Sequence, residues 1–164
     1  MQISKDFTFE MAHKLKEGFS YSTKCQNIHG HSYKATVSLG FKDSPCLNKD
    51  GMVIDFGLVS KKFKAIFDAL DHSLMISRED ELFGVTRELL LNNSQKMCVT
   101  NFNPTSENLC LALLNLLNKQ IDGIENVRVV SVSINETCTS KAKAEFGDLS
   151  LMKELYEIAF IEGR

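Results

Sequence analysis

Residues 31–41 form the sequence feature that most limits how this chain can fold. Apolar side chains alternate there with polar or small ones, and the apolar set is Tyr33, Ala35, Val37, Leu39 and Phe41. A period of two residues is typical of a half-buried β-strand. His29 and His31 precede this run and share its parity, so both would emerge from the buried face. The fold must therefore accommodate two imidazoles at one end of its sheet.

A second alternating segment covers residues 3–12. Ile3, Phe7, Phe9 and Met11 lie on one face, and Lys5 is the one break in the pattern. Residues 14–28 read as a loop that joins this strand to the next. Two antiparallel strands joined in this way are the simplest arrangement.

Other segments have the spacing of helices. Asp55 is placed to cap a helix over 56–70, in which apolar residues recur every three or four positions. Thr105 is placed to cap a second helix, and its stripe consists of Leu109, Leu113, Leu116 and Leu117. Residues 127–136 and 141–146 alternate again and predict two more strands. Residues 149–160 are interpreted as a short amphipathic C-terminal helix.

The order ββααββ predicts an α+β fold, in which two helices pack on one face of a four-stranded antiparallel sheet. Residues 76–102 are an insertion between the helices, with a helix expected over 78–93 and a strand over 96–102. We expect a single domain over residues 1–160. The last four residues, IEGR at 161–164, match a protease recognition sequence and are interpreted as a remnant of an expression vector.

Composition and charge argue against several classes of partner and site. The chain has 164 residues, 43% hydrophobic and 24% charged, with a formal net charge of −2. This charge gives no reason to expect a nucleic acid or a membrane as partner, and no apolar run approaches a membrane span. The N-terminus lacks the apolar core of a signal peptide, so we expect a cytoplasmic protein. Five scattered cysteines without a C-x-x-C pair argue against a disulfide framework and against a thiolate zinc site.

Three of the four histidines share one predicted location. His13 has the parity of the apolar residues in the first strand, as His29 and His31 have in the second. If the two strands form a hairpin, all three imidazoles meet at one end of the inward face. A single histidine is usually only a partly buried polar residue. Three together predict a Zn²⁺ site with an open fourth position, which is a catalytic arrangement.

Four further residues carry candidate chemistry, each with an alternative. Cys25 lies near the proposed metal, as a base or nucleophile, or as a fourth ligand that would close the site. Asp71 and His72 are either a surface pair at a helix end or a proton-transfer pair. Glu136 ends a strand with its carboxylate directed inward. It would pair with a lysine or bind a guanidine-like edge, as on guanine or a pterin.

These residues resemble the 6-pyruvoyl-tetrahydropterin synthase / 6-carboxy-tetrahydropterin synthase family. The segments KDFTFEMAHKL, CQNIHGHSY, GMVIDFGLV, LDHSL, NPTSENL and NETCTSKAKAEF follow the family's order and spacing over most of the chain. The combination of C-x-x-x-H-G-H with a later D-H and P-T-S-E-N is highly specific. The opening and ETCT look closest to the bacterial carboxy-tetrahydropterin synthases of queuosine and 7-deazapurine biosynthesis.

The resemblance implies a tunnelling fold (T-fold) that assembles as a homo-oligomer, typically a hexamer made of two trimers. It also implies a zinc lyase that acts on 7,8-dihydroneopterin triphosphate. The implied zinc ligands are His13, His29 and His31. Cys25 would be the general base and Asp71 and His72 the proton relay, while Glu136, helped by Thr105 and Ser106, would anchor the pterin.

The product stays open, because the first steps are shared between two branches. The leading expectation is 6-carboxy-tetrahydropterin with release of acetaldehyde and triphosphate, and the runner-up is the 6-pyruvoyl product. Two other classes are a non-catalytic zinc protein or pterin carrier and a thiol–zinc redox sensor. The chain departs from the family in its longer segment 76–102 and its C-terminal extension. It offers no clear triphosphate clamp, for which Lys14, Lys16 and Lys24 are the nearest candidates.

Overall fold

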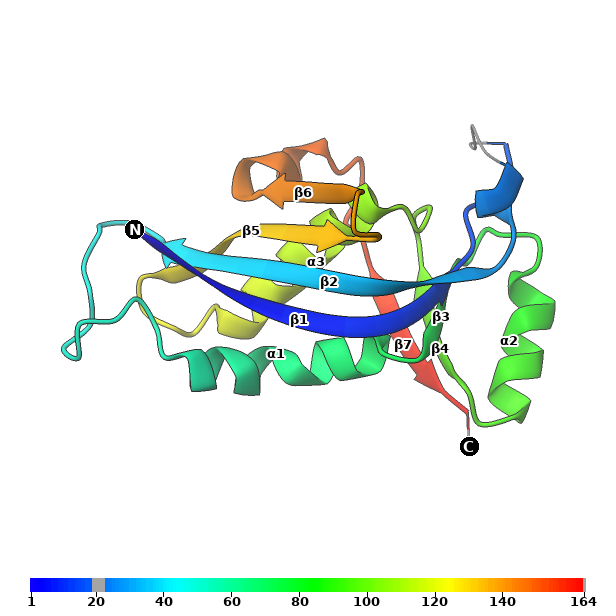
Figure 1. The fold of residues 1–164 in the computed structure, drawn as a ribbon, viewed down its shortest axis with the longest axis horizontal. Coiled ribbons are helices and arrows are strands. Elements are labelled where there is room, and N and C mark those ends of the chain that lie inside the picture. The colour runs from blue at the N-terminus through cyan, green and yellow to red at the C-terminus, as the bar shows by residue number, and fades with distance from the viewer. Residues whose placement is uncertain (19–22, 164) are drawn as a thin grey trace.

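A computed structural model describes residues 1–18 and 23–163, so part of the loop 14–28 and Arg164 lie outside the described residues. The elements in chain order are β1 (Gln2–His13), the 3₁₀ helix η1 (Thr23–Gln26), β2 (His29–Phe41), α1 (Phe56–Leu70), β3 (Ser73–Ser77), α2 (Phe83–Asn92), β4 (Lys96–Thr100), α3 (Ser106–Ile121), β5 (Val127–Asn135), β6 (Lys141–Glu145), the 3₁₀ helix η2 (Phe146–Leu151) and β7 (Ile158–Glu162). One twisted sheet runs through the molecule (Figure 1) in the order β6-β5-β2-β1-β3-β4-β7.

The two long strands β1 and β2 form the predicted antiparallel hairpin. Their register pairs His13 with His29 and Met11 with His31. Phe9 and Tyr33 also face each other, and their rings stack with centroids 5.1 Å apart. The hairpin therefore brings the three histidines to one end of the inward face, as their parity predicts.

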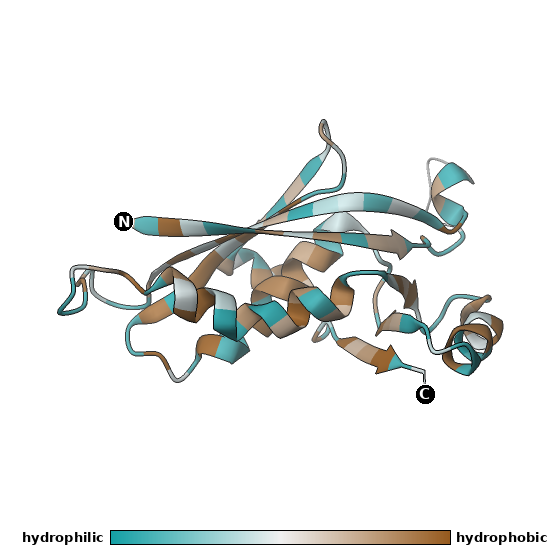
Figure 2. Cartoon of the chain, turned by 60° about the horizontal axis from the view of Figure 1, so that its bottom comes forward, coloured by the Kyte–Doolittle hydropathy of each residue, from teal (hydrophilic) through white to brown (hydrophobic). Residues whose placement is uncertain are grey.

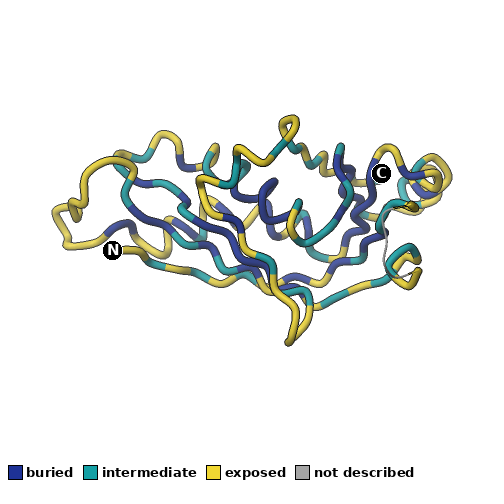
Figure 3. The backbone as a smooth tube through the Cα atoms, turned by 90° about the horizontal axis from the view of Figure 1, so that it is seen from above, coloured by how far each residue is buried: buried dark blue, intermediate teal, exposed yellow. Residues whose placement is uncertain are grey.

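Helices α1 and α3 cover the inward face of the sheet. Their N-termini are capped as expected, since the Asp55 side chain accepts a hydrogen bond from the Leu58 amide and the Thr105 side chain accepts one from Asn108. Hydrophobic and hydrophilic bands alternate along both helices and strands (Figure 2). Buried residues lie mainly where the helices pack on the sheet, whereas the loops at the ends are exposed (Figure 3). This layer is the main hydrophobic core.

The four-stranded antiparallel description is wrong, because the sheet has seven strands and is mixed. The four expected strands are β6, β5, β2 and β1, which are antiparallel to their neighbours. Beyond β1 the sheet continues through β3 and β4, which run parallel to it. All five residues of β3 are buried, so the segment has no polar alternation to reveal it.

The expected C-terminal helix over 149–160 is also wrong. The chain there leaves η2 and becomes strand β7, which pairs antiparallel with β4. Without β7, the outer edge of β4 would have no strand partner among the described residues, and backbone pairing at that edge outweighs the local helical spacing. Tyr156 packs against Phe102 with ring centroids 4.8 Å apart and directs the chain toward this edge.

The insertion 76–102 contains the two elements expected for it, as α2 and β4. A second, small core forms where Ile76, Met97 and Val99 meet partly buried residues of α2 and β7.

A buried ion pair fastens the insertion to the end of β1. The Lys14 ammonium lies 2.7 Å from the Asp80 carboxylate, and the two side chains are 2% and 1% exposed.

No helix in the described ranges is both long enough and apolar enough to cross a membrane. The single domain over 1–160 and the vector origin of 161–164 stay predictions. Within the latter range, Ile161 and Glu162 belong to β7.

Candidate metal centre and active site

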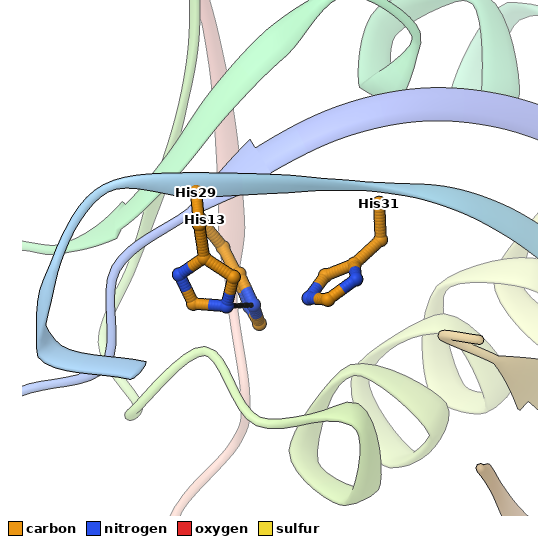
Figure 4. A group of neighbouring side chains, drawn as sticks. All are labelled: His13, His29 and His31. Carbon is orange, nitrogen blue, oxygen red and sulfur yellow. Dashed lines mark hydrogen bonds between the residues drawn. The ribbon is translucent and has the colours of Figure 1, made fainter. Parts of the chain in front are cut away.

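The imidazoles of His13, His29 and His31 converge below the β1–β2 hairpin (Figure 4). One nitrogen from each ring lies within 4.8 Å of the corresponding nitrogens of the other two. His13 is buried at 3% exposure, and the other two rings are partly exposed. The hairpin register places them together, because His13 and His29 are direct cross-strand neighbours.

Backbone carbonyls fix the orientation of two of these rings. The Nδ1 atom of His13 lies 2.9 Å from the Pro104 carbonyl, and Nδ1 of His29 lies 2.8 Å from the Asn27 carbonyl. Since a carbonyl oxygen only accepts hydrogen bonds, each Nδ1 must carry the proton. In the neutral ring, Nε2 then keeps a free lone pair directed at the other histidines. Second-shell contacts of this kind are typical of histidines that bind metals.

The resulting donor set fits a cation. The two Nε2 atoms of His13 and His29 are only 3.0 Å apart, and two lone pairs at this distance repel unless positive charge lies beside them. Burial lowers the pKa of His13, although the Pro104 carbonyl and Glu136 act in the opposite direction, and this favours the neutral ring that metals bind. Nitrogens around a tetrahedral zinc ion are separated by about 3.3 Å. The three histidines therefore form a group of nitrogen donors that could bind a metal ion.

Glu136 lies at the same point and faces the same nitrogens. Its Oε1 atom is 3.3 Å from Nε2 of His13 and 3.5 Å from Nε2 of His31. The Tyr33 hydroxyl donates a long hydrogen bond of 3.4 Å to this oxygen. The Glu136 side chain is 26% exposed, so solvent or a ligand can also reach it.

A cavity of about 280 Å³ opens in front of the histidines. Its lining includes four other residues singled out in the sequence, namely Cys25, Thr105, Ser106 and Glu136. Thr105 uses its hydroxyl to cap α3, whereas the buried Ser106 hydroxyl has no hydrogen-bond partner among the described residues. An unpartnered hydroxyl at the N-terminus of α3 is available to a polar ligand.

Asp71 and His72 lie outside this cavity, although they form the expected pair. The His72 Nδ1 atom is 2.8 Å from the Asp71 carboxylate, and the His72 side chain is 75% exposed. His72 lines a different cavity, at the edge of β1, together with Glu10, Ser32 and also His31. The parity of Glu10 and Ser32 puts their side chains on the opposite face of the sheet from the three histidines. One chain therefore does not bring this pair to the proposed metal.

The contacts of Asp71 keep it ionised. Its carboxylate accepts a hydrogen bond of 2.8 Å from the Glu10 amide. This contact, followed by the one with His72, holds the pKa of Asp71 below its ordinary value. His72 itself has φ of +58°, an uncommon conformation for a residue with a side chain, and its amide bonds the Glu10 carbonyl. The pair is thus fastened to β1 at Glu10, near the C-terminal end of the strand.

The lysines considered for a triphosphate site are largely engaged elsewhere. Lys14 is buried against Asp80, and the Lys16 ammonium lies 2.7 Å from Glu79. The cavity lining adds Glu107 and Lys141, which the sequence reasoning did not single out. Glu107 follows Ser106 directly, so its position beside the cavity was implied by the same motif.

Comparison with known proteins agrees with this geometry. The model of the family described as 6-pyruvoyl tetrahydropterin synthase matches residues 2–146. The chain belongs to this family. A 6-carboxy-5,6,7,8-tetrahydropterin synthase of Aquifex aeolicus is 32% identical to this chain. The match covers 87% of this chain and 96% of the relative. The enzyme of the same name from Haemophilus influenzae is 34% identical, over 85% and 94%.

Solved structures of other proteins show the same fold. An uncharacterized protein from Wolinella succinogenes superposes with a TM-score of 0.74 at 26% identity, covering 89% of this chain and 98% of that one. A 6-pyruvoyltetrahydropterin synthase from Plasmodium vivax superposes with a TM-score of 0.64 at 19% identity, covering 88% and 96%. At this lower identity the likeness concerns the fold alone.

Proposed function

We propose that this protein is a zinc-dependent lyase that converts 7,8-dihydroneopterin triphosphate to 6-carboxy-5,6,7,8-tetrahydropterin. The reaction releases acetaldehyde and triphosphate and belongs to queuosine and 7-deazapurine biosynthesis in the cytoplasm. The observation that carries the proposal is the convergence of three histidine Nε2 donors in a cavity that also holds a thiol and a carboxylate. Relatives named 6-carboxy-5,6,7,8-tetrahydropterin synthase support this branch over the 6-pyruvoyl product.

In this proposal His13, His29 and His31 hold the zinc ion. Bound zinc supplies Lewis acidity, which lowers the pKa of a hydroxyl group of the substrate. Backbone carbonyls orient the His13 and His29 rings, and burial favours the neutral form of His13, so these two donors are in place before the metal binds.

Cys25 acts as the general base that removes a carbon-bound proton from the substrate. Its place in the lining of the same cavity supports this role. Glu136 binds the amino-pyrimidine edge of the pterin, because a carboxylate can accept two parallel N–H bonds. The free Ser106 hydroxyl and the N-terminus of α3 at Thr105 add polar contacts to the ring.

Asp71 and His72 relay protons from a neighbouring subunit. Asp71 holds Nδ1 of His72, so that Nε2 is free to give or take a proton. The pair faces away from the cavity of its own chain, and a homo-oligomer would bring it to the cavity of the next.

Within the described residues, β1 pairs with β3 only at Met11–His13, so the outer edge of residues 2–10 is open. The outer edge of β6 is likewise free of a strand partner, and two open edges support closure into trimers and a hexamer.

The test is a product assay with zinc-loaded protein and 7,8-dihydroneopterin triphosphate, read by mass spectrometry. We expect 6-carboxy-tetrahydropterin and acetaldehyde. A 6-pyruvoyl product would keep the site and replace the branch. If zinc and pterin bind without conversion, the protein is a pterin carrier and the proposed activity is wrong.

A further inference from the structure

A second cavity lies at the opposite ends of the elements that carry the candidate active site. It has a volume of about 370 Å³, and its lining shares no residue with the cavity at the histidines. Lys119 lines it from the last turn of α3, whose first residue, Ser106, lines the other cavity. Arg128 lines it from the start of β5, the strand that ends beside Glu136. A cavity of this size accommodates a small organic ligand.

The charged side chains of this second cavity are mostly cations. Lys42, Lys119 and Arg128 carry three positive charges, and Asp122 carries the one negative charge. The Lys42 ammonium lies 3.2 Å from the Asp122 carboxylate, so these two charges offset each other. Lys119 and Arg128 form no ion pair within the described ranges, and the lining keeps two positive charges in a chain of formal net charge −2. This local surplus favours an anion.

The Arg128 guanidinium is held in place and has donors to spare. Its central carbon lies 4.7 Å from the centroid of the Phe146 ring. Its Nε atom is buried and has no hydrogen-bond partner among the residues that the structure describes. A stacked guanidinium presents its N–H groups as a fork that matches an oxyanion. The contact with Phe146 accounts for the position of Arg128 but leaves these donors unused, whereas buried donors usually have an acceptor.

Apolar and amide groups beside these cations fit a heterocycle. Phe146 is 41% exposed although Arg128 lies over its ring, and Val127 and Leu149 also line the cavity. The Asn115 side chain forms no hydrogen bond within the described part of the chain, so its amide can both donate to and accept from a ring edge. The cavity therefore combines a surface for stacking, a free amide and two unpaired cations.

We propose that this second cavity binds a mononucleotide, with the phosphate at Arg128 and Lys119 and the base against Phe146. The site goes beyond the proposed function, because it uses none of the residues of the active-site cavity. Each cation also has a structural role, since Lys119 opposes the negative end of the α3 dipole and Arg128 packs on Phe146. Neither role requires two unpaired cations and a free amide to line the same cavity.

The experiment measures the dissociation constant of AMP for the full zinc-loaded chain by isothermal titration calorimetry. AMP is the probe because guanine carries the parallel N–H pair that the proposed pterin site would accept, whereas adenine does not. We expect AMP to bind more tightly than adenosine or inorganic phosphate, since each of these offers only part of the contacts. AMP that binds no more tightly than inorganic phosphate, or not at all, would overturn the proposal.

Variants locate the site. Arg128→Met removes the charge at similar length and should weaken AMP binding by about tenfold to a hundredfold, the usual contribution of hydrogen bonds to a charged group. Arg87→Met is the matched control, because Arg87 is exposed on α2 and its loss changes the net charge equally. It should leave the affinity within about twofold, since salt screens distant charges. Lys119→Met should also weaken binding, and Lys119 is exposed, so this change does not threaten folding. Equal affinity of Arg128→Met and Arg87→Met would overturn the proposal.

Glu107→Gln tests whether AMP enters the active-site cavity instead, which Glu107 lines. We expect this variant to bind AMP as wild type does. An affinity that responds to Glu107→Gln and not to Arg128→Met would place AMP near the histidines and contradict the second site. The product assay with 7,8-dihydroneopterin triphosphate is independent of these titrations, so either proposal can fail without the other.

Discussion

At the scale of single residues, two backbone carbonyls and one buried environment prepare the histidines for a metal. Pro104 and Asn27 hold Nδ1 of His13 and His29, and burial keeps His13 neutral. Cys25 stands beside these ligands but outside the group whose nitrogens converge. This separation between ligands and thiol leads to a prediction that distinguishes a base from a ligand.

Cys25→Ala should keep one zinc ion per chain and lose most turnover. Removal of a general base typically lowers the rate by about 10²- to 10⁴-fold, whereas the three nitrogen ligands remain. Zinc content by elemental analysis and kcat for the pterin substrate check the two parts. Cys46→Ala is the control, because Cys46 is exposed and lies in another cavity. A variant at Cys25 that loses zinc would make this thiol a ligand, as in the redox-sensor alternative.

Parity along the strands was enough to predict that the three histidines and Glu136 share a face. It could not predict which side of the sheet carries His72, since that residue follows a helix and depends on how its backbone bonds Glu10. The carbonyl partners at Pro104 and Asn27 are equally invisible in the sequence, because backbone groups have no identity there. The Ser106 hydroxyl was named from the family motif, but its lack of a partner required the structure.

At the scale of elements, the insertion 76–102 extends the sheet and is bound to the strand that carries His13. The Lys14–Asp80 pair is the main polar link, and the Leu82 amide also bonds Asp80. Periodicity revealed α2 and β4 because each has a recognisable pattern. It failed for β3, which is buried on both faces, and for β7, whose strand state depends on the edge of β4.

Lys14→Met should strongly destabilise the protein, because it leaves Asp80 buried without a counter-charge. Breaking a buried pair on one side typically costs about 3–5 kcal/mol. Urea unfolding of the metal-free protein gives this free energy. Lys16→Met tests an exposed pair of the same length and should cost less than about 1 kcal/mol.

The double variant Lys14→Met/Asp80→Leu should recover most of the loss, since it removes both charges from the buried site. If Lys14→Met costs no more than Lys16→Met, the ion pair does not fasten the insertion.

At the scale of the whole molecule, the two halves of the proposed chemistry lie on opposite faces of one sheet. The histidines, Cys25 and Glu136 line one cavity, and His72 lines another. A single chain therefore has an incomplete site if His72 takes part. The open outer edges of β1 and β6 offer the surfaces through which chains could complete one another.

Mixing two inactive variants tests this arrangement. Cys25→Ala and His72→Ala should each be nearly inactive alone, and co-refolded oligomers should regain activity at about a quarter of the sites by random assembly. Activity of the mixture against either variant alone is the measurement. An active His72→Ala variant would mean that His72 is not needed. No recovery in oligomers shown to be mixed would mean that both residues act within one chain.

The central claim is that His13, His29 and His31 form one zinc site, and metal content tests it most directly. Wild type and His72→Ala should each bind one zinc ion per chain by elemental analysis after dialysis, because His72 lies on the other face. His29→Ala should bind almost none, since two of three ligands do not hold the ion through dialysis. Stoichiometric zinc in His29→Ala, or its loss in His72→Ala, would contradict the account.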